Sequence, residues 1–83
     1  MYELKHLENF AKTGDLLEIQ LTKLNDNWLL TFDTSTIEGF ALHTANGEKI
    51  RFATLDAAAE VAKDLRDLAH YEGYDLVVSV DWL

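Results

Sequence analysis

The chain has 83 residues, which is enough for a single domain over residues 1–83 with one small core. It carries a net charge of −8 at pH 7, from 15 acidic and 7 basic residues. Because affinity for nucleic acid comes mainly from Lys and Arg facing phosphates, this balance argues against direct nucleic-acid binding. Cysteine is absent, which excludes a disulfide framework and a thiolate zinc site and suits a reducing cytoplasm.

The N-terminal residues show no targeting signal. They lack the basic stretch and apolar run of a secretory signal peptide. No apolar run along the chain approaches the roughly 18 residues that a membrane span requires. We therefore expect a cytoplasmic protein without a membrane partner.

Residues 2–13 are expected to form a short amphipathic helix. Four apolar residues recur there at helical spacing, namely Leu4, Leu7, Phe10 and Ala11. Gly14 follows where a helix stop is expected.

A strand hairpin is predicted next, because the apolar period changes from helical spacing to strict alternation. Leu17, Ile19 and Leu21 alternate with polar residues and should share one face. A two-residue turn at 25–26 leads into a second alternating strand over 28–33. The expected cross-strand partners are Leu21 with Leu30 and Ile19 with Phe32.

A second hairpin is predicted around Asn46-Gly47, a dipeptide typical of a type I′ turn. It would join a third strand over 37–44 to a fourth over 48–52. The expected partners are Ala41 with Phe52 and His43 with Ile50. This register places Phe40 and Leu42 on the open face of the sheet.

A second helix is expected from Thr54, whose hydroxyl can cap it, to a stop at Gly73. Asp56 falls in the first turn, where the helix dipole favours a negative charge. The buried stripe should consist of Leu55, Ala58, Val61, Ala62, Leu65, Leu68 and Ala69. A last strand is expected over 75–82.

The predicted element order is therefore α-β-β-β-β-α-β. Runs of neighbouring strands joined by short turns favour antiparallel pairing, and the apolar stripes of both helices need a sheet to cover. We expect an α+β fold, with a mostly antiparallel sheet and the two helices on one face.

The second helix carries a line of carboxylates. Asp56, Glu60 and Asp64 recur at i, i+4 and i+8, a spacing of like charges that destabilises a helix, and Asp67 follows. Lys63 can pair with Asp67 at i+4 and with Glu60 at i−3. A catalytic carboxylate pair is disfavoured, because nothing in the pattern desolvates one of the carboxylates. Two interpretations stay open, an ordinary solvated helix face and an acidic strip that a basic partner recognises.

The side chains that commonly carry catalysis are dispersed. His6, His43 and His70 lie on three different predicted elements without metal-ligand spacing, and Ser35 and Ser79 lie outside any nucleophile elbow. His43 falls on the inward face of its predicted strand, which favours a hydrogen-bonded core histidine. We therefore predict a protein that is not an enzyme, with no catalytic residue, metal or cofactor.

The predicted open face of the sheet includes three apolar side chains, Phe40, Leu42 and Val77. A water-facing sheet surface normally reads as polar. These residues are either ordinary exposed hydrophobes or a patch for a partner protein or a second copy of the chain.

Two stretches, "LENFAKTGDLLEIQL" and "RFATLDAAAEVAKDL", resemble the small accessory proteins of plasmids called ParC-family partition-associated or RepB-like proteins. The residues that carry the resemblance are Phe10, Ala11, Thr13, Gly14, Phe52, Leu55, Asp56 and Ala57. The resemblance implies a mobile-element protein in which no catalytic residue is expected. In size and charge the chain is also similar to anti-CRISPR inhibitors, some of which present carboxylates where a defence complex expects phosphates.

Two main hypotheses follow. In the first, the chain is an anti-CRISPR whose Asp56, Glu60, Asp64 and Asp67 dock on the basic surface of a CRISPR surveillance complex. In the second, it is a plasmid partition or maintenance accessory protein that uses Phe40 and Leu42 to bind itself or another protein. A third option is a small-ligand or catalytic role for His43 and neighbouring carboxylates.

Overall fold

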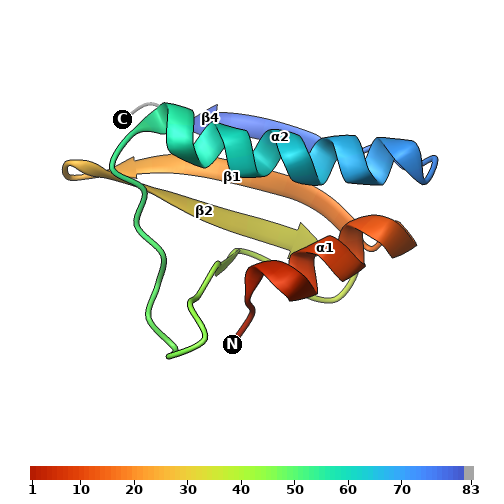
Figure 1. The fold of residues 1–83 in the computed structure, drawn as a ribbon, viewed down its shortest axis with the longest axis horizontal. Coiled ribbons are helices and arrows are strands. Elements are labelled where there is room, and N and C mark those ends of the chain that lie inside the picture. The colour runs from red at the N-terminus through yellow and green to blue at the C-terminus, as the bar shows by residue number, and fades with distance from the viewer. Residues whose placement is uncertain (82–83) are drawn as a thin grey trace.

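The computed structural model describes residues 1–81, and these form two helices and four strands in the order α-β-β-β-α-β (Figure 1). The elements are α1 (Leu4–Thr13), β1 (Leu16–Leu24), β2 (Asn27–Thr34), β3 (Phe40–Ala41), α2 (Leu55–Tyr71) and β4 (Val77–Asp81). The α+β class is confirmed. The last strand was predicted over 75–82. It begins two residues later, at Val77, and the predicted final residue, Trp82, lies outside the described residues.

The four strands form one sheet in the order β3-β2-β1-β4. The β1–β2 and β2–β3 pairs are antiparallel, whereas β4 runs parallel to β1. The sheet is therefore mixed, although mostly antiparallel as predicted. The parallel pair is possible because the chain crosses over through α2 before it enters β4, and parallel neighbours require such a long connection.

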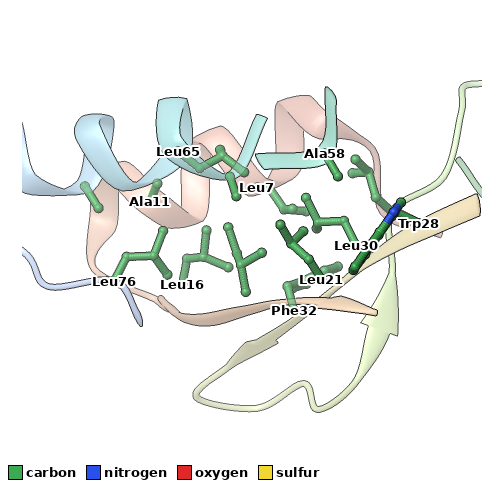
Figure 2. Packing of buried hydrophobic residues seen from close by; sticks show 14 residues of the cluster. Leu7, Ala11, Leu16, Leu21, Trp28, Leu30, Phe32, Ala58, Leu65 and Leu76 are labelled. Atoms are coloured by element: carbon green, nitrogen blue, oxygen red, sulfur yellow. The ribbon is translucent and has the colours of Figure 1, made fainter. Parts of the chain in front are cut away.

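Both helices cover the same face of the sheet, as predicted, and the core lies between the two layers (Figure 2). Figure 2 shows Leu65 and Ala58 pointing down from α2, and Leu7 from α1, toward side chains of the strands. Fourteen buried apolar residues form this cluster. Such a helix layer over a sheet leaves the other sheet face open.

The ends of the helices follow local chemistry. The Thr54 hydroxyl accepts a hydrogen bond from the Ala57 amide at 3.1 Å and so caps α2 as predicted. Gly14 caps the C-terminal end of α1 with φ of 78°, a left-handed conformation that favours glycine. A Cβ at this position would also lie 2.5 Å from the Tyr74 ring, so the close approach of that ring requires glycine too.

The β1–β2 hairpin has the predicted register, with Leu21 opposite Leu30 and Ile19 opposite Phe32. One expectation was wrong: Leu17 does not share the inward face. A β-bulge between Leu16 and Glu18 adds a residue, so the alternation shifts there. As a result Leu16 is buried and Leu17 is exposed.

The second predicted hairpin differs from the structure. Residues 48–52 form no strand and make isolated bridges, in which Lys49 pairs with His43, and Phe52 with Trp28. The prediction that His43 pairs with Ile50 and Ala41 with Phe52 was therefore wrong.

The turn chemistry explains this shift. A two-residue type I′ turn needs positive φ at both Asn46 and Gly47, but only Gly47 has it, at 86°. The loop instead spans 45–47 and is closed by the Thr44 amide donating to the Glu48 carbonyl at 2.8 Å. One extra loop residue moves the register by one.

Candidate protein-binding surfaces

The acidic strip, which we define as Asp56, Glu60, Asp64 and Asp67, is exposed along α2. At 3.6 residues per turn these four positions lie within roughly 80° of one another around the helix axis. The buried stripe of the same helix consists of Ala58, Ala62, Leu65 and Ala69, whereas Leu55, Val61 and Leu68, which were also predicted to be buried, are only partly buried against the core. The strip therefore lies on a helix whose other side is anchored in the core.

Most of the acidic strip is unpaired. Lys63 Nζ lies 3.8 Å from Asp67 Oδ2, which confirms the predicted i, i+4 pair. The expected pair between Lys63 and Glu60 does not form, since across residues 1–81 the other ion pair within 4.0 Å is Lys5 with Glu3. Asp56, Glu60 and Asp64 thus have no ion-pair partner among the described residues, which leaves three charges available to a partner.

The acidic strip extends onto α1, which sequence reasoning missed. A small hollow of about 100 Å³ between the helices is lined by Leu4, Glu8, Val61, Asp64, Leu65 and Leu68. Glu8 of α1 therefore lies on the same hollow as Asp64 of α2. The sequence signal was weak, because it required knowing that the two helices lie side by side, as their contacts and Figure 1 show.

The predicted patch of Phe40 and Leu42 does not lie on the open face of the sheet. Phe40 pairs with Phe32, whose side chain is buried under the helices, so Phe40 faces the same layer. It is half exposed at the border of that layer, 5.9 Å from the Tyr2 ring centroid.

Leu42 is only 2% exposed, because its backbone bonds to Leu30 of β2 and its side chain joins the core. It is therefore unavailable to a partner in this fold. Of the three apolar residues assigned to the open face, only Val77 belongs there, and it is 57% exposed opposite Glu18.

His43 is half buried, and its Nδ1 lies 2.9 Å from the Ala41 carbonyl oxygen. The predicted hydrogen bond is confirmed, but the core face in this segment belongs to the buried Leu42, so the predicted inward placement of His43 was wrong. Within residues 1–81, no three His, Asp or Glu side chains gather as a metal site would require.

A larger open hollow, of about 430 Å³, lies at the bulge and the β2–β3 connection. Its polar groups bond to one another: Asp33 accepts from the Gly39 amide at 2.7 Å, and Thr34 Oγ1 accepts from the Ile37 amide at 3.0 Å. The Ser35 hydroxyl donates to the Asp15 carboxylate. These bonds hold the connection together, and they do not pair a nucleophile with a histidine base.

Sequence reasoning also missed a basic flank on α2, which we define as Lys63, Arg66 and His70. All three are exposed, and their i, i+3, i+7 spacing was the signal that could have revealed them. A hollow of about 240 Å³ is lined by Ala59, Lys63 and Arg66 of α2 and by Val78 of β4. The basic flank therefore borders the last strand of the sheet, whereas the acidic strip borders α1.

In residues 1–81, neither helix combines the length and apolar character that crossing a membrane requires. Comparisons with protein-family models, with curated proteins and with solved structures give no match.

Proposed function

We propose that this chain is a non-enzymatic, cytoplasmic inhibitor from a mobile genetic element that binds a partner protein through its acidic strip. The observation that carries the proposal is the row of three carboxylates, Asp56, Glu60 and Asp64, on one exposed line of α2, none of which has an ion-pair partner within residues 1–81. A surface used only for solubility does not need like charges one turn apart, since that spacing costs helix stability.

The arrangement of the acidic strip supports recognition of a basic surface. Its carboxylates repeat every helical turn, about 6 Å along the axis, and Glu8 adds a further charge beside Asp64. A regular line of negative charge presents a basic groove with the kind of charge that a phosphate backbone presents. The partner class that fits best is therefore a protein whose groove binds nucleic acid.

A CRISPR surveillance complex is the partner we propose within that class, so the chain would act as an anti-CRISPR. Small size, net charge of −8 and the acidic strip are the features that support this choice. The mechanism is occupation of the basic groove, which would exclude the target nucleic acid. Attraction between exposed charges weakens with salt, so inhibition should weaken as well.

The alternative role as a plasmid partition accessory rests on the sequence resemblance. The apolar patch predicted for this role does not form on the open face of the sheet, because Leu42 is buried and Phe40 packs beside Tyr2. Neighbouring genes distinguish the two roles, since a partition locus carries a ParA-type ATPase.

The test is a competition assay in which purified CRISPR surveillance complexes bind labelled target DNA in the presence of the chain. The test variant, which we call the strip variant, is Asp56→Lys, Glu60→Lys and Asp64→Lys combined. The control variant is Asp26→Lys, Glu38→Lys and Glu48→Lys combined, which changes three other exposed acidic residues and shifts the net charge by the same amount.

We expect wild type and the control variant to inhibit DNA binding, and the strip variant to inhibit at least tenfold more weakly. Thermal melting accompanies the assay, because a lysine at position 56 opposes the helix dipole and costs about 0.3–1 kcal/mol. Equal inhibition by the two folded variants, or inhibition by none of the three proteins, would contradict the proposal.

A further inference from the structure

The strand β4 has a free edge. In the sheet order β3-β2-β1-β4 it pairs with β1 on one side, and no other described strand lies on its outer side. In a parallel pair, alternate residues direct their N–H and C=O groups away from the neighbour. The outer edge of β4 therefore offers backbone donors and acceptors to another extended chain.

The first four residues of β4 lack the features that normally prevent such pairing, and the charge of this strand lies at its end, on Asp81. Its first four residues, Val77 to Val80, contain no charge and no proline, and its five pairs with β1 are regular and without a bulge. Val77 is 57% exposed and Val80 is 40% exposed. An edge that is regular, uncharged and partly apolar is a ready template for strand addition.

The basic flank of α2 gives this edge a chemical preference. Lys63 and Arg66 line the hollow beside Val78, which has no acidic residue in its lining. Arg66 also lines a second hollow, of about 260 Å³, together with Asp67, His70, Tyr74, Asp75 and Leu76. Two of the seven basic residues of an acidic chain are thus gathered along one strand edge. Lys63 is already paired with Asp67 at 3.8 Å, whereas Arg66 has no ion-pair partner among residues 1–81, so a carboxylate of a partner would meet an unpaired cation there.

We propose that the β4 edge and the basic flank together bind an extended segment of a partner protein, which adds to the sheet as a fifth strand. On its helix-facing side this segment would place an apolar side chain against Ala59 and Val78, with carboxylates near Lys63 and Arg66. A second copy of the chain fits less well, since symmetric β4–β4 pairing would bring the Lys63 and Arg66 side chains of two copies together. The proposal does not depend on the function proposed for the acidic strip, although Asp67 of the strip pairs with Lys63.

The probe is a labelled synthetic peptide, Thr-Glu-Thr-Val-Thr-Glu-Thr, which presents Glu, Val and Glu on one face when extended. Binding is followed by fluorescence anisotropy against two matched peptides. In one, lysine replaces both glutamates; in the other, the backbone amides are N-methylated and cannot pair with β4. We expect binding of the first peptide and at least tenfold weaker binding of both controls.

The protein variants separate the flank from general charge. Lys63→Glu with Arg66→Glu should weaken binding of the acidic peptide at least tenfold and favour the lysine peptide. Lys12→Glu with Lys23→Glu, at two exposed sites elsewhere, should leave binding unchanged. The strip variant described above keeps Lys63 and Arg66 and should bind the acidic peptide at least as tightly as wild type, so failure of the proposed function would not affect this result.

Three outcomes would overturn the proposal: no binding of the acidic peptide, equal binding of its N-methylated form, or equal effects of the two charge-reversed variants. Sedimentation analysis tests whether a second copy of the chain binds the β4 edge instead. A dimer of wild type that Val80→Lys converts to monomer would assign the β4 edge to self-association and would also overturn the proposed partner.

Discussion

The two flanks of α2 differ in charge and in what they border, although one helix builds both. The acidic strip borders α1 at Asp64, whereas the basic flank borders β4 at Lys63 and Arg66. The buried stripe lies on the opposite side of the helix and holds both surfaces in place. A helix with four acidic and only two basic residues can therefore present two surfaces of opposite preference, provided that packing fixes its rotation.

The largest effect should come from the buried stripe, because it supports both flanks. Leu65 is 2% exposed in the core, so Leu65→Ala should lower the free energy of unfolding by about 2–5 kcal/mol. Denaturant unfolding measures this change. Tyr71→Ala is the control, since that side chain is 85% exposed on the same helix and should change stability little. A loss under 1 kcal/mol for Leu65→Ala would show that the stripe is not what holds α2.

A smaller effect should separate the flanks. Thr54→Ala removes the cap of α2 and should cost about 1 kcal/mol. Fraying of the first turn would affect Asp56, while Lys63 and Arg66 lie two turns further along and should be unaffected. Hydrogen exchange of the first-turn amides should therefore rise, with no change around Arg66. Thr54→Ser keeps the hydroxyl and should restore the wild-type pattern; equal exchange in all three proteins would argue that the cap is dispensable.

The smallest effects should have opposite signs on the two flanks. Glu60→Gln removes repulsion with Asp56 and Asp64 and should stabilise the fold by about 0.2–0.5 kcal/mol. Lys63→Gln removes the exposed pair with Asp67 and should destabilise it by a similar amount. Thermal melting at low salt measures both changes, and high salt should reduce them. Shifts of the same sign would show that neighbouring charges do not control the stability of α2.

The local parts of the fold were predictable because their signals lie close together in the chain. The cap at Thr54, the buried stripe of α2 and the register of the β1–β2 hairpin each depend on spacing within one element or across one short turn. The acidic strip was predictable for the same reason, since residues four apart on a helix share a face.

The second hairpin could not be predicted from such local signals alone. Asn46-Gly47 is a strong turn dipeptide, yet the register depends on the backbone angle that Asn46 adopts, and that angle is not positive here. The face of Phe40 was likewise set by its pairing with Phe32 on β2, a residue outside its own hairpin.

By itself, the sequence determined the α+β class, the two amphipathic helices, the first hairpin and the line of carboxylates, because periodicity and capping act over a few residues. Only the tertiary structure decided that β4 runs parallel to β1, that Leu42 is buried, and that Glu8 joins the acidic strip. It alone placed Lys63 and Arg66 beside a free strand edge. The physical reason is that a periodic pattern specifies which face of an element is apolar, whereas its neighbours are chosen by packing between residues far apart in the chain.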